Sequence, residues 1–159
     1  MSTNFSKTEC GVGLIEVLIT LLILSTTLIA LAALQTRSLQ FNQGAYFRTQ
    51  ANMLAYDMLD RIRINDSLPA SVREPLASYS MTETAHNPSS SIVSSPLSGA
   101  DKYQWLKNIA DRLPGGKGTI TCVNTSRLCT VEITWTDLNS SGLTNADEDK
   151  TAFSYQAKL

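Results

Sequence analysis

The chain has 159 residues, enough for one globular domain and a membrane-spanning segment. Thirteen lysine and arginine residues nearly balance fourteen aspartate and glutamate residues, so the formal net charge is −1. This balance argues against a nucleic-acid-binding protein, because such proteins carry an excess of basic residues on one face. We therefore expect no nucleic-acid partner.

The N-terminal region contains an apolar run, Val12 to Leu34, that is interrupted by one carboxylate, Glu16. As an α-helix this run would be about 35 Å long at roughly 1.5 Å per residue, enough to cross a hydrocarbon core of about 30 Å. A carboxylate in a segment of this kind is costly and is usually retained for a function. Glu16 would be the fifth residue of a chain that begins after Gly11.

Two simpler interpretations of this run are a secretory signal peptide and a plain signal anchor. Ala30-Leu31-Ala32 supplies a possible signal-peptidase site, but the run is longer than the 7–15 apolar residues typical of a signal peptide and contains an acid. A signal anchor explains the length but gives Gly11 and Glu16 no role. Basic residues do not decide the orientation, because the flanking charges show only a weak positive-inside bias.

A second helical pattern follows the apolar run. Apolar residues recur with helical spacing at Phe47, Ala51, Leu54, Ala55, Met58, Leu59 and Ile62. No proline occurs before Pro69, and Asn65-Asp66-Ser67 favours a helix end. We therefore predict one helix from Val12 to Asn65, with a transmembrane half (12–34) and an amphipathic half (35–65), and with Gly44 as its weakest point.

The region after this helix is predicted to be mostly loop over residues 66–100, because it is rich in proline and serine and poorly patterned. The single histidine, His86, is predicted to be a solvated loop residue. A short helix is expected from Asp101 to Leu113, where apolar residues share one face and Pro114-Gly115-Gly116 follows.

The C-terminal third alternates apolar and polar residues, which predicts strands at Thr119–Val123, Cys129–Trp135 and Phe153–Leu159. The first two would form an antiparallel hairpin. Each strand has one apolar face, and the amphipathic half of the long helix is the only large cover that the sequence offers. The predicted fold class is therefore α+β, with a long N-terminal helix packed on the small antiparallel sheet of a head domain (66–159).

Catalytic and metal-binding motifs are not evident in the sequence. Asp137 to Glu148 partly fits a calcium-binding loop, but it lies between strands rather than helices, and we favour a polar hairpin loop there. Whether it binds calcium stays open. No nucleophile with a base and no phosphate-binding loop is found, so we expect neither an enzyme nor a cofactor.

The N-terminus resembles that of type IV prepilins, whose pattern is G-F-[TS]-L-I-E. Gly11, Leu14, Ile15 and Glu16 match this pattern, whereas Val12 and Gly13 depart from it. The segments Ser38–Gln40 and Ala51–Asn65, and the V-x-I-x-W run at Val131–Trp135, are similar to the PilV branch of minor pilins. The resemblance is strong over residues 10–65 and absent over residues 66–118.

The resemblance implies a pilin-like fold and a minor type IV pilin that initiates or modifies pilus assembly. Residues 1–11 would be a leader that prepilin peptidase removes after Gly11, and Val12 would then be N-methylated. Glu16 would pair with the N-terminal amine of a neighbouring subunit. The expected location is the inner membrane, with the head in the periplasm, or the extracellular pilus.

The expected partners are other minor and major pilins, bound through the N-terminal helix, and the inner-membrane assembly platform. Major pilins commonly carry a proline in the membrane half of the helix, and its absence here favours a minor subunit. A pseudopilin of a type II secretion system, a single-pass signal-anchored periplasmic binding protein and a secreted binding domain remain alternatives.

The cysteine count agrees with removal of a leader. Three cysteines are an odd number for an exported protein, and Cys10 lies in the proposed leader. Its removal leaves Cys122 and Cys129, which we expect to form a disulfide in an oxidising compartment. A metal site is not expected from two cysteines and one histidine.

Overall fold

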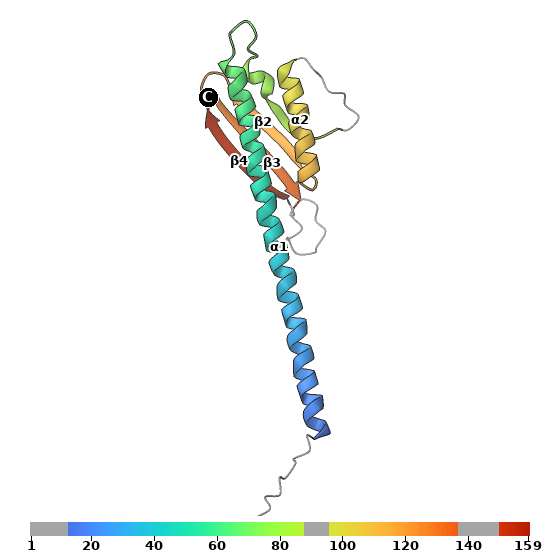
Figure 1. The fold of residues 1–159 in the computed structure, drawn as a ribbon. Helices are drawn as coiled ribbons and strands as arrows, with labels where there is room; N and C mark the ends of the chain where they lie inside the picture. The colour runs from blue at the N-terminus through green and yellow to red at the C-terminus, as the bar shows by residue number, and fades with distance from the viewer. Residues whose placement is uncertain (1–12, 88–95, 137–149) are drawn as a thin grey trace, which may run out of the picture. The chain divides into compact units, whose positions relative to one another are not determined.

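A computed structural model describes residues 13–87, 96–136 and 150–159. The elements follow the order α1 (Leu14–Ser67), the 3₁₀ helix η1 (Leu76–Tyr79), β1 (Met81–Ala85), α2 (Leu97–Arg112), β2 (Lys117–Val123), β3 (Leu128–Thr136) and β4 (Lys150–Lys158) (Figure 1). The fold is α+β, as predicted, with a long N-terminal helix packed on an antiparallel sheet.

Helix α1 contains 54 residues and runs two residues beyond the predicted end at Asn65. It is not interrupted at Gly44, which is buried. The Leu68 N–H still donates to the Asn65 carbonyl at 3.1 Å, and Pro69, which lacks an N–H, then stops the helix. The chain forms two compact units that divide within α1 between Leu39 and Gln40.

The sheet has the strand order β1-β2-β3-β4, and every neighbouring pair is antiparallel. Strands β2 and β3 form the predicted hairpin, in register from Lys117 opposite Thr134 to Val123 opposite Leu128. Strand β4 pairs with β3 along its whole length. The three predicted strands are therefore confirmed, and each begins before its expected first residue.

The prediction that residues 66–100 are mostly loop is wrong in part. This region contains η1, the edge strand β1 and the first turn of α2, which begins at Leu97 rather than Asp101. Strand β1 is short and almost fully exposed, so it lacks the alternation of buried and exposed side chains that identifies a strand in sequence. Its main-chain pairing with β2 defines it.

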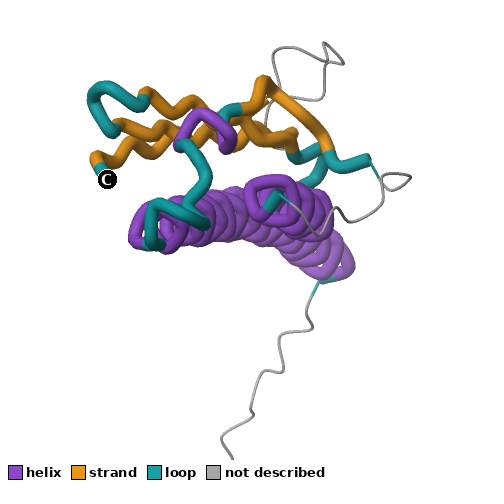
Figure 2. Tube along the Cα trace, turned by 90° about the horizontal axis from the view of Figure 1, so that it is seen from above, coloured by secondary structure: helices purple, strands orange, loops and turns teal. Residues whose placement is uncertain are grey.

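The core of residues 40–159 lies between a layer of strands and a layer of helices (Figure 2). The predicted apolar stripe of α1 is buried from Ala51 to Ile62, with Phe47 half-buried at its end. The expectation that α1 alone covers the sheet is wrong, because α2 adds Trp105, Leu106 and Ile109 to the same core. The opposing sheet face contributes Ile120, Cys122, Cys129, Val131, Ile133 and Trp135.

Helix α2 is fixed to both layers by Trp105. Its indole Nε1–H donates to the Leu54 carbonyl of α1 at 2.8 Å, in a fully buried position. The ring also lies over Gly118 of β2, where an added Cβ would come within 2.3 Å of Cζ3 of the indole. A tryptophan fits here because the facing residue has no side chain.

Candidate assembly site on the N-terminal helix

Glu16 lies in the first turn of α1. The N–H groups of Glu16 and Val17 both donate to the Gly13 carbonyl, at 2.9 Å and 3.4 Å, so the helix starts immediately before the carboxylate. The partial positive charge of a helix N-terminus favours an acid at this place. Glu16 is exposed and forms no ion pair within the described part of the chain.

Gly11 and Val12, the residues expected to flank the peptidase cut, lie outside the described residues. The cleavage position, the methylation of Val12 and the pairing of Glu16 with an amine therefore stay predictions. The described part of the site is the helix that would follow the cut, beginning at Leu14.

The apolar half of α1 presents its side chains outward on all sides. Every leucine, isoleucine and valine from Leu14 to Leu34 is 45–81% exposed. The most apolar 18-residue window of α1 has a mean hydropathy of 2.6, and none of it is buried. By length and composition this helix suits a membrane anchor or an N-terminal signal sequence.

The hydroxyl groups of four residues in this half form hydrogen bonds within the helix. Thr20, Ser25, Thr26 and Thr27 each donate to the carbonyl three residues earlier, at 2.8–2.9 Å. An unpaired hydroxyl would be costly in hydrocarbon, so these bonds allow four polar residues to lie in an apolar segment. The helix surface therefore carries no charge between Glu16 and the next charged residue, and it is apolar as far as Leu34 apart from these hydroxyls.

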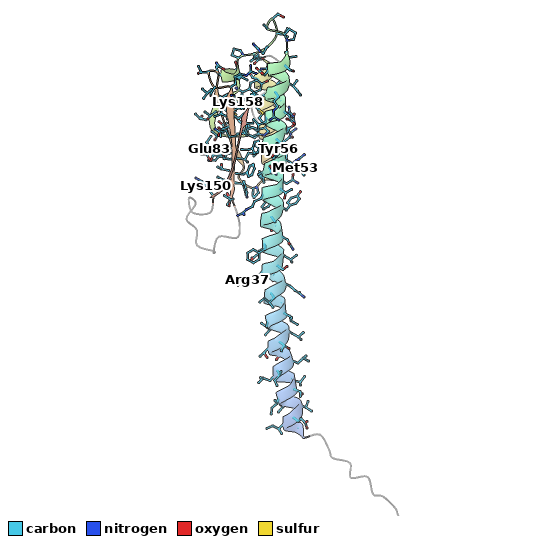
Figure 3. The ribbon with its side chains drawn as sticks, turned by 90° about the vertical axis from the view of Figure 1, so that its left-hand side faces the viewer. Arg37, Met53, Tyr56, Glu83, Lys150 and Lys158 are labelled. Atoms are coloured by element: carbon cyan, nitrogen blue, oxygen red, sulfur yellow. A yellow bond between two sulfur atoms is a disulfide. The ribbon has the colours of Figure 1, made fainter. Side chains whose placement is uncertain are left out.

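That next charged residue is Arg37, labelled in Figure 3. Twenty uncharged residues separate it from Glu16, a helical length of about 30 Å. This length equals the thickness of a typical hydrocarbon core. Glu16 and Arg37 are therefore spaced to lie near the two surfaces of a membrane.

The structure contains the expected disulfide between Cys122 and Cys129, which are directly opposite each other on β2 and β3. The bond closes the turn that connects these strands. Two residues of this turn contact the end of α1 and the 3₁₀ helix that follows it: Arg127 pairs with Asp66 in the last turn of α1, and Asn124 accepts a hydrogen bond from the Ala77 N–H of η1 at 3.2 Å. The disulfide therefore supports a turn that holds the end of the long helix.

A polar network at the end of α1 was not predicted. Asn65 is fully buried, and its amide donates to the Glu74 carbonyl at 2.8 Å and accepts from the Glu74 N–H at 3.0 Å. The Glu74 carboxylate in turn accepts from the N–H groups of Leu97 and Ser98, the first residues of α2. The only sequence signal was the Asn65–Ser67 helix end, which gives no information about a residue nine positions later.

The carboxylate of Glu74 acts as a cap for α2 that comes from a different segment. Partial burial acts to raise the pKa of Glu74, but the hydrogen bonds from Ser98 and Leu97 and the charge of Lys102 outweigh it and lower the pKa. A charged acceptor at a helix N-terminus satisfies amides that have no partner within the helix. Pro96, the residue before α2, has no side chain that can do so.

A second polar cluster connects α1 and α2. Arg61 donates to Asp57 on its own helix and to Asp101 on α2, both at 3.1 Å. The Tyr79 hydroxyl donates to the same Asp101 at 3.0 Å. Burial, followed by the charge of Asp101, raises the pKa of Tyr79. The cluster fixes the two helices and η1 together.

His86 lies in the loop after β1, half-buried, with its ring edge-on to Tyr103 at a centroid distance of 5.1 Å. Its loop position was predicted, but the ring contact was not. Within residues 13–87, 96–136 and 150–159, no three His, Cys, Asp or Glu side chains are grouped as metal ligands. The calcium-loop candidate, Asp137 to Glu148, lies outside these ranges.

No known family model, no curated protein and no solved structure matches this chain. The architecture itself combines a long, apolar N-terminal helix, a four-stranded antiparallel sheet packed on its second half, and a disulfide in the sheet. This combination is pilin-like.

Proposed function

We propose that the chain is a minor type IV pilin of the PilV type, which takes part in initiating or modifying pilus assembly. The observation that carries the proposal is the position of Glu16, an exposed carboxylate in the first turn of an apolar helix that continues without a break into the head. A simple anchor needs the apolar residues but has no use for the acid.

The proposed mechanism begins with removal of residues 1–11. The new amine of Val12 then lies four residues before Glu16, and each subunit carries one positive and one negative charge near the same helix end. When helices of neighbouring subunits pack together in lipid or in a fibre, the carboxylate of one pairs with the amine of the next. Water is scarce there, so the pair is poorly screened and selects the correct register.

Residues 12–34 would hold the protein in the inner membrane, with residues 66–159 in the periplasm or on the extracellular pilus. Prepilin peptidase, other pilins and the inner-membrane assembly platform are the proposed partners. The absence of proline from the membrane half of the helix supports a minor subunit. A pseudopilin would use the same mechanism, and co-purification with pilins rather than with secretion-system subunits separates the two.

The test is the mass of the mature protein purified from a host with and without a prepilin peptidase. We expect a chain that begins at Val12 and carries one added methyl group, only when the peptidase is present. Gly11→Val is the control, because a branched side chain next to the cut should block processing while leaving membrane insertion intact. Retention of Met1 in the presence of the peptidase, or a start at Ala33, would contradict the proposal.

A further inference from the structure

The two edges of the sheet differ in how open they are to another strand. Strand β1 has five residues and a register shift between Met81 and Thr84, features that blunt an edge. Strand β4 has nine residues in unbroken register with β3, and no strand among the described residues pairs with its other side. From Thr151 to Ala157 it carries no charge and no proline.

The free hydrogen-bonding groups of β4 can be assigned to particular residues. The Leu159 N–H donates to the Arg127 carbonyl at 2.8 Å, toward the β3 side. Because main-chain groups alternate sides along a strand, the N–H and C=O groups of the odd-numbered residues face β3. Those of Ala152, Ser154 and Gln156 therefore face the free edge.

The core is incompletely covered beside this edge. Phe153 and Tyr155 of β4 are half-buried, whereas Val131 and Ile133 of the neighbouring strand are fully buried. A groove of about 520 Å³ runs between α1 and β4, lined by Arg48, Thr49, Asn52, Thr151, Ala152 and Phe153. An added strand would place alternate side chains over this groove.

The charged side chains along the described part of this edge are positive. Lys150 and Lys158 mark the two ends of β4 (Figure 3), and Arg48 lies in the wall of the groove. Strand β4 contains no acidic residue. Neither Arg48 nor Lys158 forms an ion pair with another residue of the described ranges.

We propose that the free edge of β4 binds an extended segment of a partner protein that has acidic residues near its two ends. Main-chain hydrogen bonds would add the segment to the sheet, and its acids would face Arg48, beside the start of β4, and Lys158 at its end. A second copy is disfavoured as the partner: β4 paired antiparallel with itself would place Lys150 opposite Lys158 at both ends, and like charges directly opposite are destabilising. This interaction is separate from the proposed helix-mediated assembly.

The test uses the full chain in detergent micelles and a synthetic nine-residue peptide of alternating threonine and valine with glutamate at both ends. Amide hydrogen exchange, followed by NMR, reports the edge directly. At saturating peptide we expect exchange at Ala152, Ser154 and Gln156 to slow by about tenfold or more, with little change at the odd-numbered amides that already face β3. The same peptide with lysine at both ends should give no such protection.

Two variants make the result specific. Ser154→Pro removes an N–H that faces the edge and not β3, so it should abolish protection by the peptide; Ser154→Ala is its matched control and should bind normally. Lys158→Glu should weaken binding of the acidic peptide and strengthen binding of the basic one. The proposal is overturned if the three edge amides exchange slowly without peptide, if both peptides bind equally, or if Ser154→Pro, when folded, binds like the unmodified chain.

Discussion

Asn65 illustrates how one buried side chain can take the place of main-chain pairing. Its amide satisfies both the N–H and the C=O of Glu74, as a neighbouring strand would. No water is needed at this position, since Asn65 is fully buried and both of its polar atoms have partners. The end of α1 and the segment before η1 are held together by these two bonds.

We expect Asn65→Ala to lower the free energy of unfolding of the head by about 2–4 kcal/mol, because two main-chain groups at Glu74 would lose their partners. Asn65→Asp loses the donor to the Glu74 carbonyl and buries a carboxylate against it, so near neutral pH it should be destabilised at least as much. Thermal unfolding of the full chain in detergent, followed by near-ultraviolet circular dichroism, measures both. Equal stability of Asn65→Ala and the unmodified chain would show that the two hydrogen bonds between Asn65 and Glu74 contribute nothing to stability.

Glu74 makes the stability of the head depend on pH. The hydrogen bonds from α2 hold its pKa below the ordinary value of 4.5, so the folded state binds the proton more weakly than the unfolded state. The stabilisation is therefore present above pH 4.5 and is lost as the pH falls through the lower, folded-state pKa. Glu74→Gln should cost about 0.3–1 kcal/mol near pH 7, and should flatten the loss of stability in acid. An unchanged acid profile in Glu74→Gln would exclude this cap as the cause.

At the scale of elements, the sequence predicted those whose signal is local. The stripe from Ala51 to Ile62 and the alternation along β3 each bury one face, and this periodicity is visible in the sequence alone. The missed elements depend on distant partners. Strand β1 exists through pairing with β2, and the first turn of α2 is capped by Glu74, more than twenty residues earlier.

Gly118 is another element-scale feature that periodicity does not reveal. It occupies an inward-facing position of β2, where a larger apolar residue would be the usual choice, because the Trp105 ring already fills that space. Gly118→Ala should lower the free energy of unfolding by about 1–3 kcal/mol, since the new Cβ would collide with the ring and force a shift. Adding Trp105→Leu should relieve part of this cost in the double variant. If the destabilisation of the double variant equals the sum for Gly118→Ala and Trp105→Leu measured separately, collision with the Trp105 ring is not the cause.

For the whole molecule, the sequence predicted the fold class and the membrane-length helix because both follow from hydrophobic patterning. The disulfide was expected because removal of Cys10 with the proposed leader would leave two cysteines. The surroundings of the site were harder to predict from the sequence. The hydrogen bonds of Thr20 and Ser25 within the helix, and the network that fixes the end of α1, are seen only in the folded structure. The proposed role of Glu16 depends on contacts between molecules, which neither the pattern nor one folded chain contains.

The proposed role of Glu16 predicts that one substitution affects assembly but leaves membrane insertion and leader cleavage intact. Glu16→Ala makes the helix more apolar, so we expect it to insert in the membrane at least as well as the unmodified chain. Cleavage after Gly11 should persist, because the peptidase requires a small residue at the cut. The fold of the head should be unchanged, because Glu16 contacts none of the described head residues through a hydrogen bond or an ion pair.

Assembly is the step that should fail in Glu16→Ala. A Val12 amine that enters a helix-packed, water-poor environment without its counter-charge would remain unpaired, and loss of one partner of such a pair costs about 3–5 kcal/mol. We therefore expect at least about a tenfold loss of protein co-purifying with other pilins, relative to processed protein in the membrane. Glu16→Asp should retain part of this yield because it keeps the charge, whereas Glu16→Gln, which matches the shape of glutamate but is neutral, should behave like alanine. If Glu16→Ala is processed and co-purifies at the unmodified level, Glu16 is a tolerated acid near the membrane surface and the electrostatic mechanism is wrong.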